Sequence, residues 1–220
     1  MPFVVSAIAT VLLAILAILR HRVRSGGSGA HLIVQSGYAI TPTPKMLAAE
    51  RQDHEDVMRL LEAAIRSSGF FETEAIPLLL SKLRDGQEPF ARVHTKVAFG
   101  GDEFLSVQEK RVLGLNTRMK YSREFISYFD PKCLKTIEPK SMLENMHLSA
   151  FHRVARKRDL VEFRSLGVKR VRIVPVGDAR DCGKIKRFKK VYDINDLPEL
   201  PLPGCTAPYC RCMYEPIIPK

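Results

Sequence analysis

The chain has 220 residues, 45% of them apolar, which is room for one or two small packed domains and argues against a disordered chain. Lys and Arg outnumber Asp and Glu by 35 to 24, which gives a formal charge of +11. Such a basic surplus favours anionic partners, either nucleic acid or the anionic face of a membrane. The five cysteines are an odd number, which fits a framework of disulfides poorly.

Residues 1–24 predict a transmembrane anchor with a basic flank. The run Phe3–Leu19 has no charged side chain, and the 19 residues from Met1 would span roughly 28 Å as a helix, close to the thickness of a bilayer core. The cluster Arg20–Arg24 follows this run instead of preceding it. That order favours an uncleaved single-pass anchor, with the N-terminus outside and the following domain in the cytoplasm. A cleaved signal peptide and a buried helix are the alternatives.

Residues 25–39 are predicted to be a linker, which opens with the flexible stretch Ser25–Ala30. In a reducing cytoplasm, structural disulfides are rare. The predicted topology therefore bears on how the cysteines downstream are interpreted.

Residues 40–166 are predicted to form a mostly helical domain. Apolar residues at three- and four-residue spacing predict a helix from Pro44 to a stop at Gly69. The stretch Glu72–Arg84 predicts a second helix, ending near Gly86, and Arg92–Phe99 is a candidate strand.

Two capping-box patterns predict further helix starts in this domain. Ser106–Glu109 would open a helix to about Leu113, and Ser141–Glu144 a longer one to Leu166, with Gly167 as its stop. A third helical piece, Tyr121–Phe129, is expected between them.

Residues 167–220 are predicted to be a small β-rich module that contains cysteines. Val168–Val176 alternates basic and apolar residues, which is typical of a strand, and Arg187–Ile194 is a second candidate. The expected fold class is thus α+β: an N-terminal transmembrane helix, a mostly helical middle and this module.

Four cysteines of the module suggest a zinc site. Cys182, Cys205, Cys210 and Cys212 follow the spacing C-x22-C-x4-C-x-C, and four thiolates complete the tetrahedral shell of zinc. Cys205 and Cys210 have the spacing of one zinc knuckle, but Ile185 stands where a partner of Cys182 would be. Buried thiols without metal and a redox or disulfide pair are the alternatives. Cys133 is expected to be a small buried apolar residue.

The cysteine module also resembles a known family. Its last 50 or so residues are similar to the C-terminal segment of Mu-like phage head morphogenesis (minor head) proteins. The matching positions are Asp178, Arg180, Cys182, Val191, Tyr192, Pro198, Pro201, Cys210, Arg211 and Cys212. The resemblance implies a phage-head-like structural role. The chain departs from that family in Ile185, where a second cysteine is common, and in the predicted anchor.

The segment Arg153–Lys190 is strongly basic, with 14 Lys or Arg against four Asp or Glu. We expect it to contact anionic lipid headgroups or nucleic acid. The candidate binding residues are Arg156, Lys157, Arg158, Lys169, Arg170, Arg172, Lys184, Lys186, Arg187, Lys189 and Lys190.

The sequence favours a membrane-anchored binding protein over an enzyme. It has no phosphate-binding glycine loop, G-x-S-x-G or H-E-x-x-H motif. The enzymatic alternative is a thiol-based or metal-assisted activity of Cys210 and Cys212 with Asp178 or Asp181.

Overall fold

The computed structural model describes residues 43–85, 103–178, 181–185 and 190–218. Lys45–Lys220 form one compact unit. The predicted anchor, the linker and the candidate strand Arg92–Phe99 lie outside the described residues. Of the helices in the described part, none combines the length and the apolar character needed to cross a membrane.

The first described helix, α3, runs Pro44–Ser68, as the apolar spacing predicted. Its buried residues Val57, Met58, Leu61 and Ile65 fall three or four apart and form one face. The helix stops at Gly69, whose φ of 69° is readily reached only without a side chain.

The second predicted helix is confirmed as a short 3-10 turn, η2 (Thr73–Ala75), followed by α4 (Ile76–Asp85). Pro77 is tolerated because it lies in the first turn, where the backbone N–H has no helical partner. Leu79, Leu80 and Leu83 of α4 are buried in the same core as α3.

Three more helices follow in the described part: α6 (Val107–Leu113), α7 (Arg123–Ser127) and α8 (Pro139–Ser165). The capping box at Ser106 and Glu109 is confirmed, with both of its hydrogen bonds formed. The second predicted box is wrong, since α8 begins at Pro139 with Glu138 as its N-cap, three residues before the predicted N-cap Ser141. The carboxylate of Glu138 caps that end by accepting from the N–H groups of Lys140 and Ser141.

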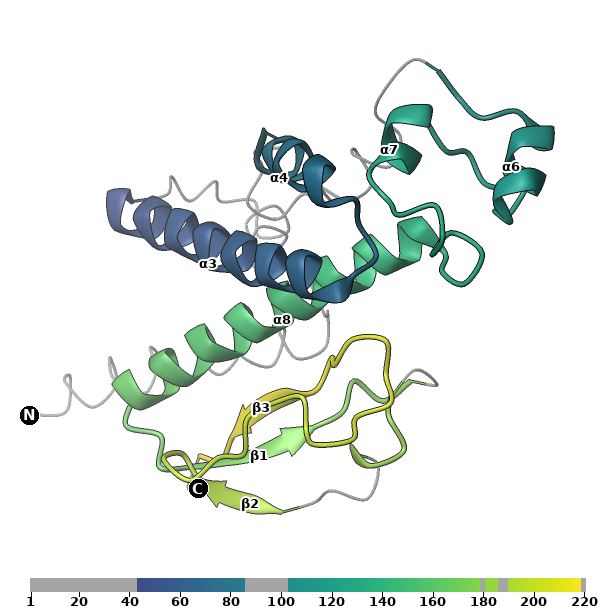
Figure 1. Ribbon diagram of the computed structural model, residues 1–220. Helices are drawn as coiled ribbons and strands as arrows, with labels where there is room; N and C mark the ends of the chain where they lie inside the picture. Colours follow the sequence, from purple (N-terminus) through teal and green to yellow (C-terminus); the bar gives the residue numbers. More distant parts are fainter. Residues whose placement is uncertain (1–42, 86–102, 179–180, 186–189, 219–220) are drawn as a thin grey trace, which may run out of the picture. The chain divides into compact units, whose positions relative to one another are not determined.

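The C-terminal part is a three-stranded antiparallel sheet in the order β2-β1-β3 (Figure 1). The strands are β1 (Arg170–Val174), β2 (Val191–Asp193) and β3 (Met213–Pro216). Both predicted strands are confirmed in part, and β3 was not predicted. Val171 and Ile173 are buried, whereas Arg170 and Arg172 alternate with them on the exposed face.

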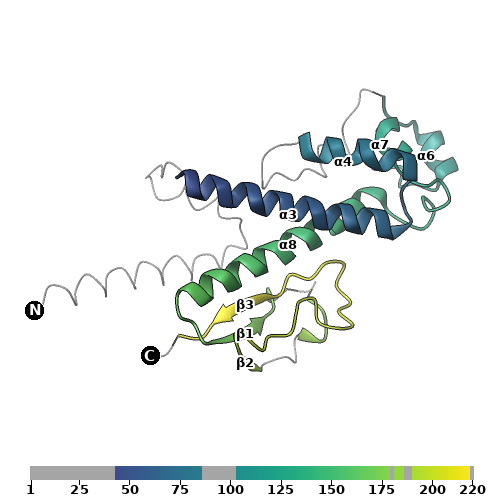
Figure 2. The same ribbon diagram turned by 60° about the vertical axis from the view of Figure 1, so that its left-hand side comes forward.

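Helix α8 joins the two halves of the unit. On one side it packs with α3 and α4 in an apolar core that includes Leu61, Leu79, Phe125 and Leu143. On another side it contacts β3. The described residues are thus mostly helical with one small sheet, and the cysteine loops lie next to both the sheet and α8 (Figures 1 and 2).

Candidate metal centre

The four cysteines predicted as zinc ligands come together from three separate stretches of chain. Cys182 follows β1, Cys205 lies in the loop after β2, and Cys210 and Cys212 immediately precede β3. Cys182, Cys210 and Cys212 are buried, and Cys205 is half-buried. None of them is in a disulfide.

The thiols interact as a chain of neighbours. Cys205 lies near Cys182 and Cys210, and Cys210 near Cys212, so that these thiols shift one another's pKa. Among the described side chains, however, no three His, Cys, Asp or Glu groups are arranged as a ready-made metal site. The four sulfurs therefore lie near one another but are not arranged as the four ligands of a tetrahedral metal site.

The electrostatics of the pair Cys210 and Cys212 favour one thiolate. The hydrogen bond from Cys212, with a smaller contribution from the charge of Arg156, lowers the pKa of Cys210 to about 6. The same bond and burial raise the pKa of Cys212. A thiolate is the form of cysteine that binds metal and attacks electrophiles.

A buried arginine holds the loop that carries these two cysteines. The side chain of Arg156, on α8, is 5% exposed. One of its nitrogens donates to the carbonyl oxygens of Cys210 (3.0 Å) and Cys212 (3.3 Å), and the other to that of Leu200 (3.2 Å). Arg156 therefore cannot face an anionic partner as the sequence predicted.

A second arginine holds the loop of Cys182. Arg211 lies between Cys210 and Cys212 in the chain and donates to both carboxylate oxygens of Asp178. The carboxylate of Asp181 accepts from the backbone N–H groups of Gly177 (2.6 Å) and Asp178 (3.1 Å). Both aspartates thus hold a turn, and Arg211 is the arginine that pairs with them.

Further contacts tie the cysteine loops together. The ammonium group of Lys184 donates to the carbonyl oxygen of Pro203, joining the loops of Cys182 and Cys205. The imidazole of His152, on α8, stacks on the ring of Tyr209 with centroids 5.7 Å apart. Burial, together with the charges of Arg156 and Arg211, lowers the pKa of His152 to about 4.

Ile185 explains the missing knuckle partner. Its side chain is 1% exposed and among the most buried of the described residues. Ile185 thus belongs to the small apolar core of the module, and it stands where a C-x2-C knuckle would have its second cysteine.

Cys133 is not part of this group. It is half-buried, and its thiol lies 3.7 Å from the carbonyl oxygen of Gly69.

The other residues that were predicted to bind an anionic partner make different contacts. Arg158 pairs with Asp53, and Arg172 with Glu215. Lys190 lies over the ring of Tyr192.

Within the described part of the chain, five of these residues are exposed and have no ion pair: Lys157, Lys169, Arg170, Lys184 and Lys190. Lys186, Arg187 and Lys189 lie outside the described residues.

Sequence reasoning missed the two arginines that organise the site. A signal for Arg156 was present, because Phe163, a buried residue of α8, follows it by seven positions and so shares its face of the helix. No comparable signal marked Arg211, whose partner is 33 residues away.

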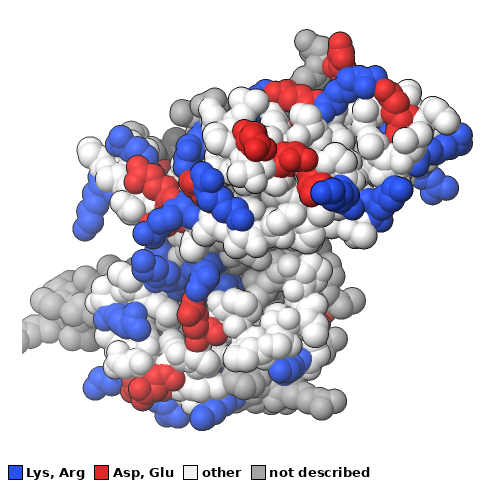
Figure 3. Space-filling model, viewed as in Figure 1, with Lys and Arg blue, Asp and Glu red and all other residues white. Residues whose placement is uncertain are grey.

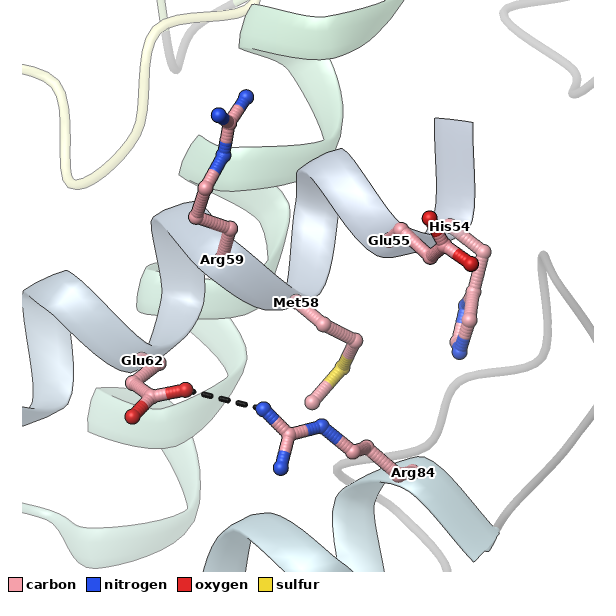
Figure 4. A pocket seen from close by; sticks show the side chains of 6 residues that line it. All are labelled: His54, Glu55, Met58, Arg59, Glu62 and Arg84. Atoms are coloured by element: carbon pink, nitrogen blue, oxygen red, sulfur yellow. Dashed lines mark hydrogen bonds and ion pairs between the residues drawn. The ribbon is translucent and has the colours of Figure 1, made fainter. Parts of the chain in front are cut away.

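A separate hollow of about 490 Å³ lies between α3 and α4 (Figure 4). His54, Glu55, Met58, Arg59, Glu62 and Arg84 line it. The ion pair of Glu62 and Arg84 (2.9 Å) crosses from one helix to the other, and the hydrogen bond from Arg66 keeps the pKa of Glu62 below its usual value. This ion pair links the two helices, and the hollow has no cysteine among its lining residues.

No protein family, curated protein or solved structure matches the chain. The resemblance of the C-terminal residues to phage head morphogenesis proteins therefore stays a prediction.

Proposed function

We propose that the chain is a membrane-anchored binding protein whose C-terminal module, residues 167–220, is closed by a structural zinc ion. The ligands would be Cys182, Cys205, Cys210 and Cys212. The observation that carries this proposal is the proximity of the four thiols, which come from three stretches of sequence and shift one another's pKa. The charge-free run Phe3–Leu19 supports the anchor, with the module on the cytoplasmic side.

A structural role for the metal follows from the surroundings of the thiols. Four thiolates fill the shell of zinc and leave no open position for a substrate. The sheet is small, with strands of five, three and four residues. Such a module gains little from its own apolar core, and zinc commonly supplies the missing stability in small domains.

The second candidate function is a thiol-based activity. The lowered pKa of Cys210, to about 6, favours it, because a thiolate beside a second thiol is suited to thiol–disulfide exchange. Asp178 and Asp181 would contribute only by holding the turn, since Arg211 and backbone N–H groups occupy their carboxylates.

Metal content separates the two candidates. The full chain, purified in detergent under reducing conditions, should contain one zinc per chain by elemental analysis. Cys210→Ser and Cys182→Ser should lose it, and Cys133→Ser should keep it. Metal-free wild type, even after growth in added zinc, together with ready oxidation of Cys210 and Cys212, would favour the thiol-based function and contradict the zinc proposal.

A further inference from the structure

The two long helices, α3 and α8, run antiparallel. Asp53 forms an ion pair with Arg158 at 2.9 Å, and one helical turn further along α3, Val57 lies across from Val154 in the wall of a small cavity. The start of α3 and the end of α8 therefore lie at the same end of the helix pair, as both views show (Figures 1 and 2). We call this the tether end, because the chain leading from residues 1–42 enters here.

Both helices project past their last mutual ion pair at the tether end. From Asp53 back to Pro44 is about 13 Å of helix, and from Arg158 on to Ser165 about 10 Å. Strand β1 starts just after α8, so Arg170 lies here too. The backbone N–H of Ile217 donates to the carbonyl oxygen of Arg170, which places Ile217 beside it.

The tether end exposes aliphatic side chains. Of the ten large apolar residues exposed in the described part, five are here, each 42–60% exposed: Met46, Leu47, Val161, Leu166 and Ile218. None of these five is aromatic.

Basic side chains stand among these aliphatic ones. Lys45, Arg51, Arg164, Lys169 and Arg170 are exposed here, and so are Asp193 and Asp196. In the view of Figure 3, Lys and Arg side chains gather along the left-hand edge, over the start of α3 and the sheet, with fewer acidic ones between them.

We propose that the tether end docks on the anionic headgroup surface of the same membrane that holds the anchor. Exposed aliphatic groups ringed by Lys and Arg suit the boundary between headgroups and acyl chains. Covalent connection supports this occupant, since residues 25–42 can separate Pro44 from the predicted anchor by at most about 65 Å. The inference rests on the proposed function, because without the anchor nothing would hold this surface close to a bilayer.

The chain contains no Trp, so a single introduced Trp reports one position. We would place one at Leu47 or Leu166 of the tether end, at Val112 of α6 as an exposed control, and at Leu12 of the predicted anchor. Each full-length variant would be reconstituted in vesicles of phosphatidylcholine with a quarter phosphatidylserine, with and without brominated acyl chains that quench nearby Trp.

Leu47→Trp and Leu166→Trp should be quenched at least fivefold more than Val112→Trp. Omitting phosphatidylserine, or adding the substitutions Lys45→Gln, Arg51→Gln, Lys169→Gln and Arg170→Gln, should remove most of that quenching. Quenching of Leu12→Trp should persist in every case.

Two outcomes overturn the docking proposal and leave the anchor in place. One is quenching of Leu12→Trp with positions 47 and 166 no more quenched than 112. The other is the same pattern together with binding of a labelled DNA duplex that the four Gln substitutions abolish, which would assign the surface to nucleic acid. An unquenched Leu12→Trp refutes the anchor itself.

Discussion

The guanidinium of Arg156 donates a 3.0 Å hydrogen bond to the carbonyl oxygen of Cys210, a residue 54 positions further along the chain. With the bonds to Cys212 and Leu200, it serves the backbone carbonyls of three buried residues. The loop that presents the last two cysteines is therefore fixed by a helix of the other half of the unit.

Replacing Arg156 by Met should destabilise the protein by about 3 kcal/mol or more, because three buried carbonyl oxygens lose their donors. Lys157→Met is the matched control, since Lys157 is the exposed neighbour on the same helix and should change stability by no more than about 0.5 kcal/mol. Urea unfolding of the two variants at equal zinc concentration measures the difference. Equal effects would show that the Arg156 bonds contribute nothing.

Cys210→Ser should loosen the C-terminal module and leave the α3–α4 core intact. The module depends on the proposed zinc, whereas the core buries its own apolar faces. Limited proteolysis of the full chain should cut the variant first between residues 175 and 212, and should cut Cys133→Ser no faster than wild type. A Cys210→Ser module as protected as wild type would mean that no metal holds it.

Stability should fall as the pH drops from about 6.5 towards 4, because of His152. Its neutral ring is enclosed by Tyr209, Arg156 and Arg211, so the folded state holds a pKa of about 4 against about 6.5 in the unfolded chain. The unfolded state therefore binds the proton first, and the stabilisation is complete only above pH 6.5.

Between pH 7 and pH 4.5, wild type should lose about 2–3 kcal/mol more than His152→Gln. Unfolding free energies of both proteins at the two pH values give this difference, and effects of pH on the thiols cancel in it. If the two proteins lose stability in parallel, the imidazole is already protonated in the folded state at pH 4.5.

The proposed anchor should remain on the mature protein. The membrane fraction should yield a chain whose intact mass includes residues 1–24, and it should resist extraction with alkaline carbonate. A reporter fused after Lys220 should be active only if it works in the cytoplasm. A mature chain that starts near residue 25 would show that the run Phe3–Leu19 is a cleaved signal.

The helices were predictable because their information is local. The buried stripe of α3 and the box at Ser106 are read from residues three or four apart. The start of α8 was misplaced because Glu138, an uncommon cap, competes with a standard pattern at Ser141.

The remaining features depend on distant contacts. Strand β3 is four residues long and forms only because β1 offers an open edge, more than 35 residues earlier in the chain. The four cysteines were predicted as a group from spacing, and the structure does bring them together. The roles of Arg156 and Arg211 could not be predicted, since a basic residue in a basic segment looks like surface until its partners are known.

Arg156 and Arg158 are two residues apart on α8, which places them about 200° apart around the helix axis. One guanidinium is bonded to the cysteine loop and the other to Asp53 of α3. Because α8 is held on opposite sides, rotation about its long axis in either direction would break one of these two interactions. The two arginines therefore fix the rotation of α8, and with it the orientation of the sheet relative to α3.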